Sequence, residues 1–135
     1  MPELDIARLR ALVFCKKFEK KADGITLTGV HDTRFSGSFP VKFDELFLYV
    51  SFEVSSPRTV SMLLQFRVND GSIQDFANSE ADIDDDLVVT SPLDLSQWEF
   101  TEPGRYSFAL YVDGVLVGST SLTIHNMMRD EVAFA

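Results

Sequence analysis

Residues 104–124, GRYSFALYVDGVLVGSTSLTI, alternate apolar and polar side chains around a central Asp-Gly pair. An alternation with a period of two places successive side chains on opposite faces of a β-strand. Before the pair, the residues of one parity are all apolar: Tyr106, Phe108, Leu110 and Val112. Asp-Gly between two such runs favours a type I′ turn, because both central residues of that turn need positive φ. This stretch therefore predicts a β-hairpin.

The same alternation recurs toward the N-terminus. Residues 46–54 and 60–68 each place apolar side chains on one face, and the Ser-Ser-Pro-Arg sequence between them is a turn signal. We interpret these two runs as a second hairpin. Residues 11–18 and 25–31 flank a Lys-Ala-Asp-Gly turn and predict a third hairpin.

Two segments lack this alternation and are predicted to be loops. One is residues 33–44, and the other is the acidic stretch 78–86, which follows a short predicted strand at residues 72–77. Short strands separated by turns about every ten residues, without intervening helices, indicate an all-β protein. We predict a two-layer antiparallel β-sandwich, immunoglobulin-like or C2-like, with seven to nine strands; a partly open β-barrel is the alternative. The 135 residues form one domain in this interpretation, with its core at about residues 10–125.

Composition restricts the classes of partner and compartment. The formal net charge is −9 and the sequence pI is about 4.5, so contacts with nucleic acid phosphates or an anionic membrane are disfavoured. No apolar stretch approaches the roughly 18 residues that a membrane span needs, and the first residues carry Glu3 and Asp5 where a signal peptide carries cations. With a single cysteine, no internal disulfide can form, and we expect a cytoplasmic protein.

Cys15, the only thiol, and His31 are the candidates for a catalytic nucleophile and its base. A turn near residues 22–23 would place Cys15 opposite Val30 and His31 opposite Phe14, so that the cysteine and the histidine project from opposite faces. The pair His31-Asp32 and the second histidine, His125, are accompanied by no motif of a known catalytic site. The sequence therefore predicts no catalytic residues and a structural cysteine.

The acidic stretch is the most conspicuous chemical feature. Asp82, Asp84 and Asp86 alternate, and clustered carboxylates are the ligands that Ca²⁺ prefers. Leu87 and Leu93 stand where an EF-hand loop would have its turn glycine and its bidentate glutamate, so this is not an EF-hand. A sandwich can instead gather aspartates from neighbouring loops. The stretch is therefore either a Ca²⁺ site, in which case Ca²⁺ is the cofactor, or a solvated acidic loop.

Aromatic side chains provide the candidate interaction residues. Trp98, with Phe100, Tyr49 and Tyr111, would form a platform on which a sugar could stack, or would pack in the core. Tyr49 and Tyr111 belong to the more polar face of their predicted strands. Exposed side chains at these positions would favour the platform, and buried ones would favour packing in the core. The tail, residues 126–135, ends in apolar residues and could dock on its own sheet or on a partner.

Three stretches together resemble a bacterial family of small single-domain proteins of unknown function. The first combines residues 11–15, Ala22-Asp-Gly24 and the LTGVHD run at 27–32; the second is Phe39-Pro40; the third is Pro103-Gly-Arg-Tyr106 with Tyr111-Val-Asp-Gly114. The resemblance covers about residues 10–125. It implies a β-sandwich and no known activity, ligand or catalytic residue. In many sandwich domains the glycine of such a Pro-Gly-x-Tyr stretch turns the chain, and the tyrosine packs at a corner of the sheet.

These observations together predict a non-enzymatic binding or accessory module. We expect it to act through protein–protein contacts or self-association, without nucleic acid and without membrane insertion. The alternative is a Ca²⁺-dependent or carbohydrate-binding module that uses the acidic stretch at residues 80–86.

Overall fold

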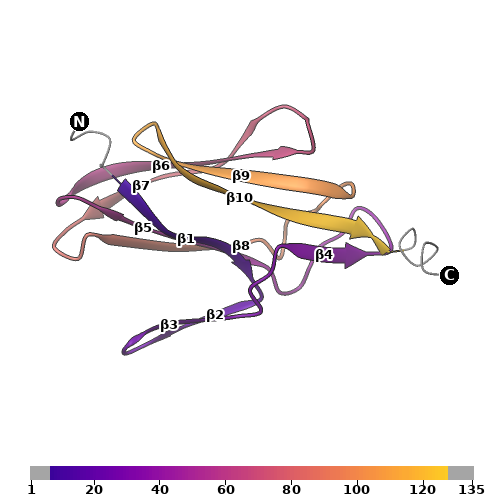
Figure 1. The fold of residues 1–135 in the computed structure, drawn as a ribbon, viewed down its shortest axis with the longest axis horizontal. Helices are drawn as coiled ribbons and strands as arrows, with labels where there is room; N and C mark the ends of the chain where they lie inside the picture. The colour runs from indigo at the N-terminus through magenta and orange to yellow at the C-terminus, as the bar shows by residue number, and fades with distance from the viewer. Residues whose placement is uncertain (1–6, 128–135) are drawn as a thin grey trace.

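The computed structural model describes residues 7–127, which form an all-β fold of two facing sheets and a separate hairpin (Figure 1). In spatial order, the first sheet contains β1 (Ala7–Cys15), β5 (Phe47–Val54) and β8 (Val88–Asp94). The second contains β4 (Thr33–Ser36), β10 (Val115–Asn126), β9 (Gly104–Val112), β6 (Arg58–Val68) and β7 (Gln74–Ile83). The hairpin consists of β2 (Lys17–Lys21) and β3 (Gly24–Thr28). The prediction of a β-sandwich is confirmed, with ten strands in the described residues instead of seven to nine. No helix long and apolar enough to cross a membrane occurs in this part of the chain.

The two sheets face each other through the alternating apolar residues that the sequence analysis singled out. Leu48, Val50, Phe52 and Val54 of β5 are buried, as are Tyr106, Phe108, Leu110 and Val112 of β9. Fully burying a side chain of this size stabilises the fold by about 1.5–3 kcal/mol. The facing rows therefore fix which side of each sheet points inward. β5 and β9 lie at the centre of their sheets, and their inward-facing side chains are the middle of the core.

The turns predicted for the Asp-Gly hairpin and for the Pro-Gly-x-Tyr stretch are present. Asp113 and Gly114 both have positive φ, 50° and 80°, and Val112 pairs with Val115 across the turn. Tyr106 is 2% exposed, and its hydroxyl donates to the carbonyl oxygen of Glu102 at 2.7 Å. Both short motifs fold as local sequence chemistry predicts.

The hairpin predicted from residues 46–54 and 60–68 is wrong. β5 pairs with β1 and β8 in one sheet, whereas β6 pairs with β7 and β9 in the other. The intervening residues 55–57 are exposed and carry the chain from the end of one sheet to the other. A short polar connection with a proline is compatible with a hairpin in one sheet and with a connection between two sheets. Here it connects the two sheets, so that β5 and β6 each bury one face against the opposite sheet.

Two segments predicted as loops contain strands. β7 continues to Ile83, through most of the acidic stretch, and residues 33–36 form β4, which pairs in parallel with β10. Both strands lie at the edges of the five-stranded sheet. Edge strands expose one rim to water and so accept charged residues that a central strand excludes. The N-terminal residues 1–6 and most of the tail, residues 128–135, lie outside the described residues.

Candidate binding groove

The β2–β3 hairpin, here called the arm, projects from the end of β1 beneath the outer face of the three-stranded sheet (Figure 1). Its strands pair from Lys17 opposite Thr28 to Lys21 opposite Gly24. The same register continues to a bridge between Phe14 and His31, as predicted. Every residue of β2 is exposed to solvent. The arm therefore stands apart from the sheet for most of its length.

Contacts between the arm and the rest of the fold are concentrated at its base. The ring of Phe18 packs edge-to-face on Phe47 of β5, with centroids 5.2 Å apart. The Nζ of Lys17 lies 3.4 Å from a carboxylate oxygen of Glu45. Gly29 has φ of 69°, and a Cβ there would lie 2.9 Å from the side chain of Lys16, so the closing turn of the arm requires glycine.

A groove of about 910 Å³ separates the arm from the sheet. Its floor is the outer face of the three-stranded sheet, where Ala11, Ser51 and Thr90 lie side by side on three neighbouring strands. Tyr49 and Pro92 form the next row of this floor. The arm contributes the opposite wall, with Phe18, Lys20, Lys21, Ala22, Gly24 and Ile25.

A β-bulge brings a cation into the groove. The pairing of β1 with β5 shifts between Leu9 and Ala11, so Arg10 is the extra residue. A bulge changes the direction in which the following side chains point. As a result, Arg10 and Ala11 both line the groove, although strict alternation would place them on opposite faces.

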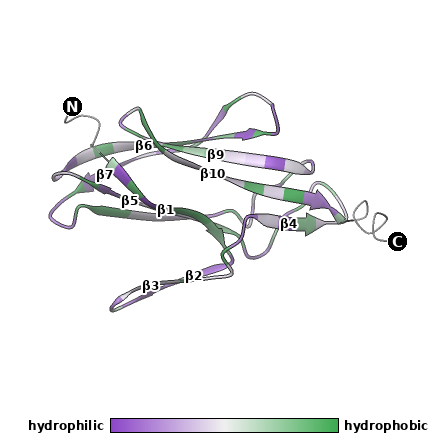
Figure 2. Ribbon diagram, in the orientation of Figure 1, coloured by the Kyte–Doolittle hydropathy of each residue, from purple (hydrophilic) through white to green (hydrophobic). Residues whose placement is uncertain are grey.

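The groove is basic although the protein is acidic. Arg10, Lys20 and Lys21 line it, together with one carboxylate, Asp86. None of the three cations forms an ion pair with another residue of the described part of the chain, whereas Arg8, Lys17 and Arg58 do. Figure 2 shows that β2 is largely hydrophilic, whereas the C-terminal half of β1 is hydrophobic. The groove therefore combines unpaired positive charge with a mixed apolar and hydroxyl-bearing floor.

Of the four aromatic residues predicted to form a platform, Trp98 and Phe100 lie together, with ring centroids 5.2 Å apart, whereas Tyr49 and Tyr111 lie elsewhere. Tyr49 lies on the floor of the groove and is 7% exposed. Tyr111 lines a shallow hollow of about 390 Å³ on the outer face of the other sheet. Trp98 packs in the core, with ring centroids 4.6 Å from Phe76 and 4.8 Å from Phe66. A shared stacking platform for a sugar is therefore not assembled from these residues.

The three aspartates considered as Ca²⁺ ligands have different surroundings. Asp82 lies in β7 and accepts a hydrogen bond from the hydroxyl of Thr59 at 2.6 Å. An oxygen of Asp84 lies 3.5 Å from the backbone nitrogen of Asp86 in the turn before β8. Asp86 lines the groove. Within residues 7–127, no three His, Cys, Asp or Glu side chains gather where they could hold a metal ion.

Cys15 and His31 are separated as the predicted register requires. Cys15 is fully buried, and burial raises the pKa of its thiol. His31 pairs with Phe14, the residue before Cys15, so its side chain belongs to the other face of the strand pair. The His31 Nδ1 lies 2.6 Å from the carbonyl oxygen of Gly29. The two side chains therefore do not form a nucleophile and base pair.

The sequence alone did not predict that Arg10, Lys20 and Lys21 line one groove, because their proximity depends on the orientation of the arm. One sequence signal was available. Residues 8–21 contain six of the twelve Lys and Arg residues and only one acidic residue, Glu19. Such an excess in an acidic chain indicates a local positive surface.

Comparison with known proteins identifies a similar fold and a family. Among solved structures, a Pseudomonas fluorescens alkylpurine DNA glycosylase, AlkC, bound to DNA containing an abasic site analog, matches with a TM-score of 0.55 at 11% sequence identity. The match covers 89% of this chain but only 30% of the glycosylase chain, and at this identity it shows the fold alone. No curated protein sequence matches. A model described as "Family of unknown function (DUF6941)" matches residues 10–125, and the chain belongs to this family.

Proposed function

We propose that the protein is a non-enzymatic binding module that acts through protein–protein contacts, and that the groove beneath the arm is its binding surface. The observation that carries this proposal is the groove itself, about 910 Å³ between the arm and the sheet. A two-stranded hairpin is at best marginally stable on its own. A bound partner would therefore stabilise an arm that is attached mainly at its base.

The sheet edges are less suited to binding by strand addition. β1 has a bulge at Arg10, and β8 contains Pro92. β7 carries Asp75, Glu80 and Asp82, and β4 is four residues long. Bulges, proline, charges and short length are the features that oppose pairing of an edge with another strand. These features support the groove over edge pairing, including edge pairing between two copies of this chain.

A selection of random peptides displayed on phage tests the proposal. Peptides enriched on the intact protein are measured against two variants that each remove one exposed apolar side chain. Ile25→Ser alters the groove, and Leu116→Ser alters an exposed residue in the β9–β10 hairpin of the other sheet. Neither substitution changes the net charge, and thermal unfolding confirms that both variants are folded.

We expect Ile25→Ser to weaken the enriched peptides about tenfold, the loss that follows from removing about 1.4 kcal/mol of contact. Leu116→Ser should leave their affinity unchanged. Peptides that bind Ile25→Ser as tightly as the original protein would place the binding surface elsewhere. A selection that enriches no peptide would also count against the proposal.

A further inference from the structure

We infer that the arm groove binds a short, extended, acidic segment of a partner protein that also carries an apolar side chain. This inference rests on the proposed function and specifies the chemistry of the ligand. Three features of the groove carry it: cations without an ion pair among the described residues, apolar side chains in the lining, and the length of the arm.

The charge of the groove is complementary to an acidic ligand. Arg10 enters from the bulge in β1, and Lys20 and Lys21 come from the end of β2. They line one space from two opposing walls and form no ion pair within the described residues. The chain has 21 acidic residues against 12 basic ones, so three unpaired cations in one groove are an exception to its composition. Carboxylates of a ligand would supply the missing partners.

Apolar side chains line the same groove as these cations. Phe18 and Ile25 are both on the face of the arm that lines the groove, and each is 37% exposed. Phe47 covers Phe18 on one side, at the base. Tyr49 and Pro92 lie on the floor of the same groove. An apolar side chain inserted here would cover Ile25, which a wholly charged ligand would leave exposed.

The length of the arm indicates the length of the ligand. The arm has five residues in each strand, so it is about 17 Å long at roughly 3.3 Å per residue. An extended peptide of about five residues covers this length, whereas five residues of α-helix cover only about 8 Å. The groove therefore fits about five or six residues in extended conformation.

A nucleic acid fits the surroundings of the groove less well. Asp86 lines the groove, and Asp84 and Asp85 directly precede it in the turn between β7 and β8. A phosphate backbone that continued past the groove would meet this negative turn and the net charge of −9. A peptide confined to the groove meets one carboxylate, that of Asp86, beside three cations.

Fluorescence anisotropy with labelled peptides tests the inference on the full chain. The probe is a seven-residue peptide that alternates aspartate with leucine. Two peptides of the same length serve as comparisons, one with lysine and one with serine in place of aspartate. A labelled single-stranded oligonucleotide is the fourth probe. Binding is measured for the unmodified protein and for two double variants of equal charge change.

The groove variant is Lys20→Glu with Lys21→Glu, and the control is Lys42→Glu with Arg105→Glu. All four residues are exposed, and only the first two line the groove. We expect the aspartate peptide to bind at least about tenfold more tightly than the other two peptides, since several charge contacts add together. The groove variant should lose at least tenfold in affinity for it, and the control should stay within about twofold. Raising the salt concentration should weaken binding.

Equal binding of the aspartate and serine peptides, or no effect of the groove variant, would overturn the inference. So would an oligonucleotide that binds more tightly than the aspartate peptide and depends on Lys20 and Lys21. If phage selection instead yields neutral or basic peptides that depend on Ile25, the proposed function stands and only the acidic ligand is rejected. If no selected peptide depends on Ile25, the proposed function fails as well.

Discussion

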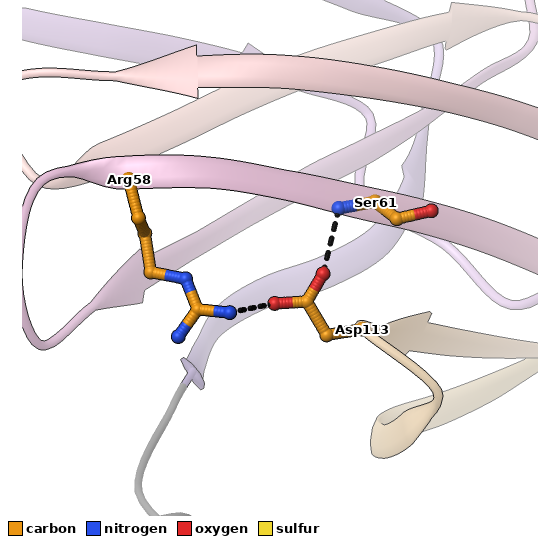
Figure 3. A network of polar contacts seen from close by, with 3 residues as sticks. All are labelled: Arg58, Ser61 and Asp113. Carbon is orange, nitrogen blue, oxygen red and sulfur yellow. Dashed lines mark hydrogen bonds and ion pairs between the residues drawn. The ribbon is translucent and has the colours of Figure 1, made fainter.

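Asp113 in the β9–β10 turn fastens that turn to the neighbouring strand β6 through Arg58 (Figure 3). One carboxylate oxygen of Asp113 pairs with the Arg58 guanidinium, and the other accepts a hydrogen bond from the backbone N–H of Ser61 at 2.9 Å. The backbone N–H of Asp113 in turn donates to the carbonyl oxygen of Ser61 at 2.8 Å. The residue that the turn needs for its positive φ therefore also joins the hairpin to a third strand.

We expect Asp113→Ala to lower the free energy of unfolding by about 1–3 kcal/mol, because it leaves the Arg58 guanidinium and the Ser61 N–H without their acceptor. Asp113→Asn should cost about half as much, since asparagine tolerates positive φ and keeps one acceptor oxygen. Urea unfolding of both variants, together with Arg58→Ala and the Arg58→Ala, Asp113→Ala double variant, measures the coupling. Additive effects of the two alanine substitutions would contradict the ion pair.

Gly104 and Gly114 offer a matched test of close packing. Both have positive φ, but a Cβ at Gly104 would lie 2.2 Å from the Asn69 side-chain oxygen, whereas a Cβ at Gly114 meets no atom within 4 Å. That oxygen accepts a hydrogen bond from the backbone N–H of Arg105, with an N–O distance of 3.0 Å. We expect Gly114→Ala to cost about 1–2 kcal/mol from backbone strain, and Gly104→Ala about 2–4 kcal/mol, because it also displaces Asn69. Equal losses in urea unfolding would show that Asn69 moves aside without penalty.

Local chemistry made much of the fold predictable. The type I′ turn at Asp113-Gly114 and the hydroxyl of Tyr106 on the Glu102 backbone depend on residues a few positions apart, and both are present. The bridge between Phe14 and His31 follows from counting back from one turn. Where the partner is set by short-range geometry, the sequence alone was sufficient.

Features set by distant packing were not predictable in this way. The runs that contain Val54 and Val60 alternate as the strands of a hairpin would, yet they belong to different sheets, which the exposed residues 55–57 connect. Asp82 was expected in a loop but lies in β7, where Thr59 of the neighbouring strand donates to it. The groove depends on the direction in which the arm leaves the sheet, which the alternation of its residues does not encode. Tyr49 was predicted to be an interaction residue and lines the groove, whereas the sequence-based prediction did not include the cations that line it as well.

Stability at alkaline pH should depend on Tyr106. Burial raises the pKa of its phenol above the ordinary value, which is about 10. The unfolded chain therefore loses this proton first, so the stabilising contribution is complete below pH about 10 and is lost as the pH rises through the folded pKa. We expect Tyr106→Phe to cost about 0.5–1.5 kcal/mol at pH 7 by removing the hydrogen bond to Glu102. Its stability should then fall less steeply than that of the original protein above pH 10. Parallel curves in urea unfolding between pH 8 and 11 would contradict this assignment.

Cys15 should be protected from thiol reagents in the folded protein. It is fully buried, and the raised pKa reduces the fraction of reactive thiolate. We expect reaction with a disulfide reagent at pH 8 to be slower than in urea by on the order of a hundredfold, since labelling needs local opening. Immediate reaction of the folded protein would instead indicate an accessible, activated thiol and would reopen the question of catalysis.

Calcium should leave the thermal unfolding midpoint unchanged. A ligand that binds only the folded state raises that midpoint, but Asp82 is bonded to Thr59 and Asp86 faces the groove, so the aspartates do not point to a common centre. Thermal unfolding with and without millimolar CaCl₂ gives the answer, with MgCl₂ at equal ionic strength as the control. A rise of several degrees with CaCl₂ alone, abolished by Asp84→Asn with Asp86→Asn, would establish a calcium site. The acidic turn would then have to rearrange on binding, because within the described residues no three such side chains are in place to hold an ion.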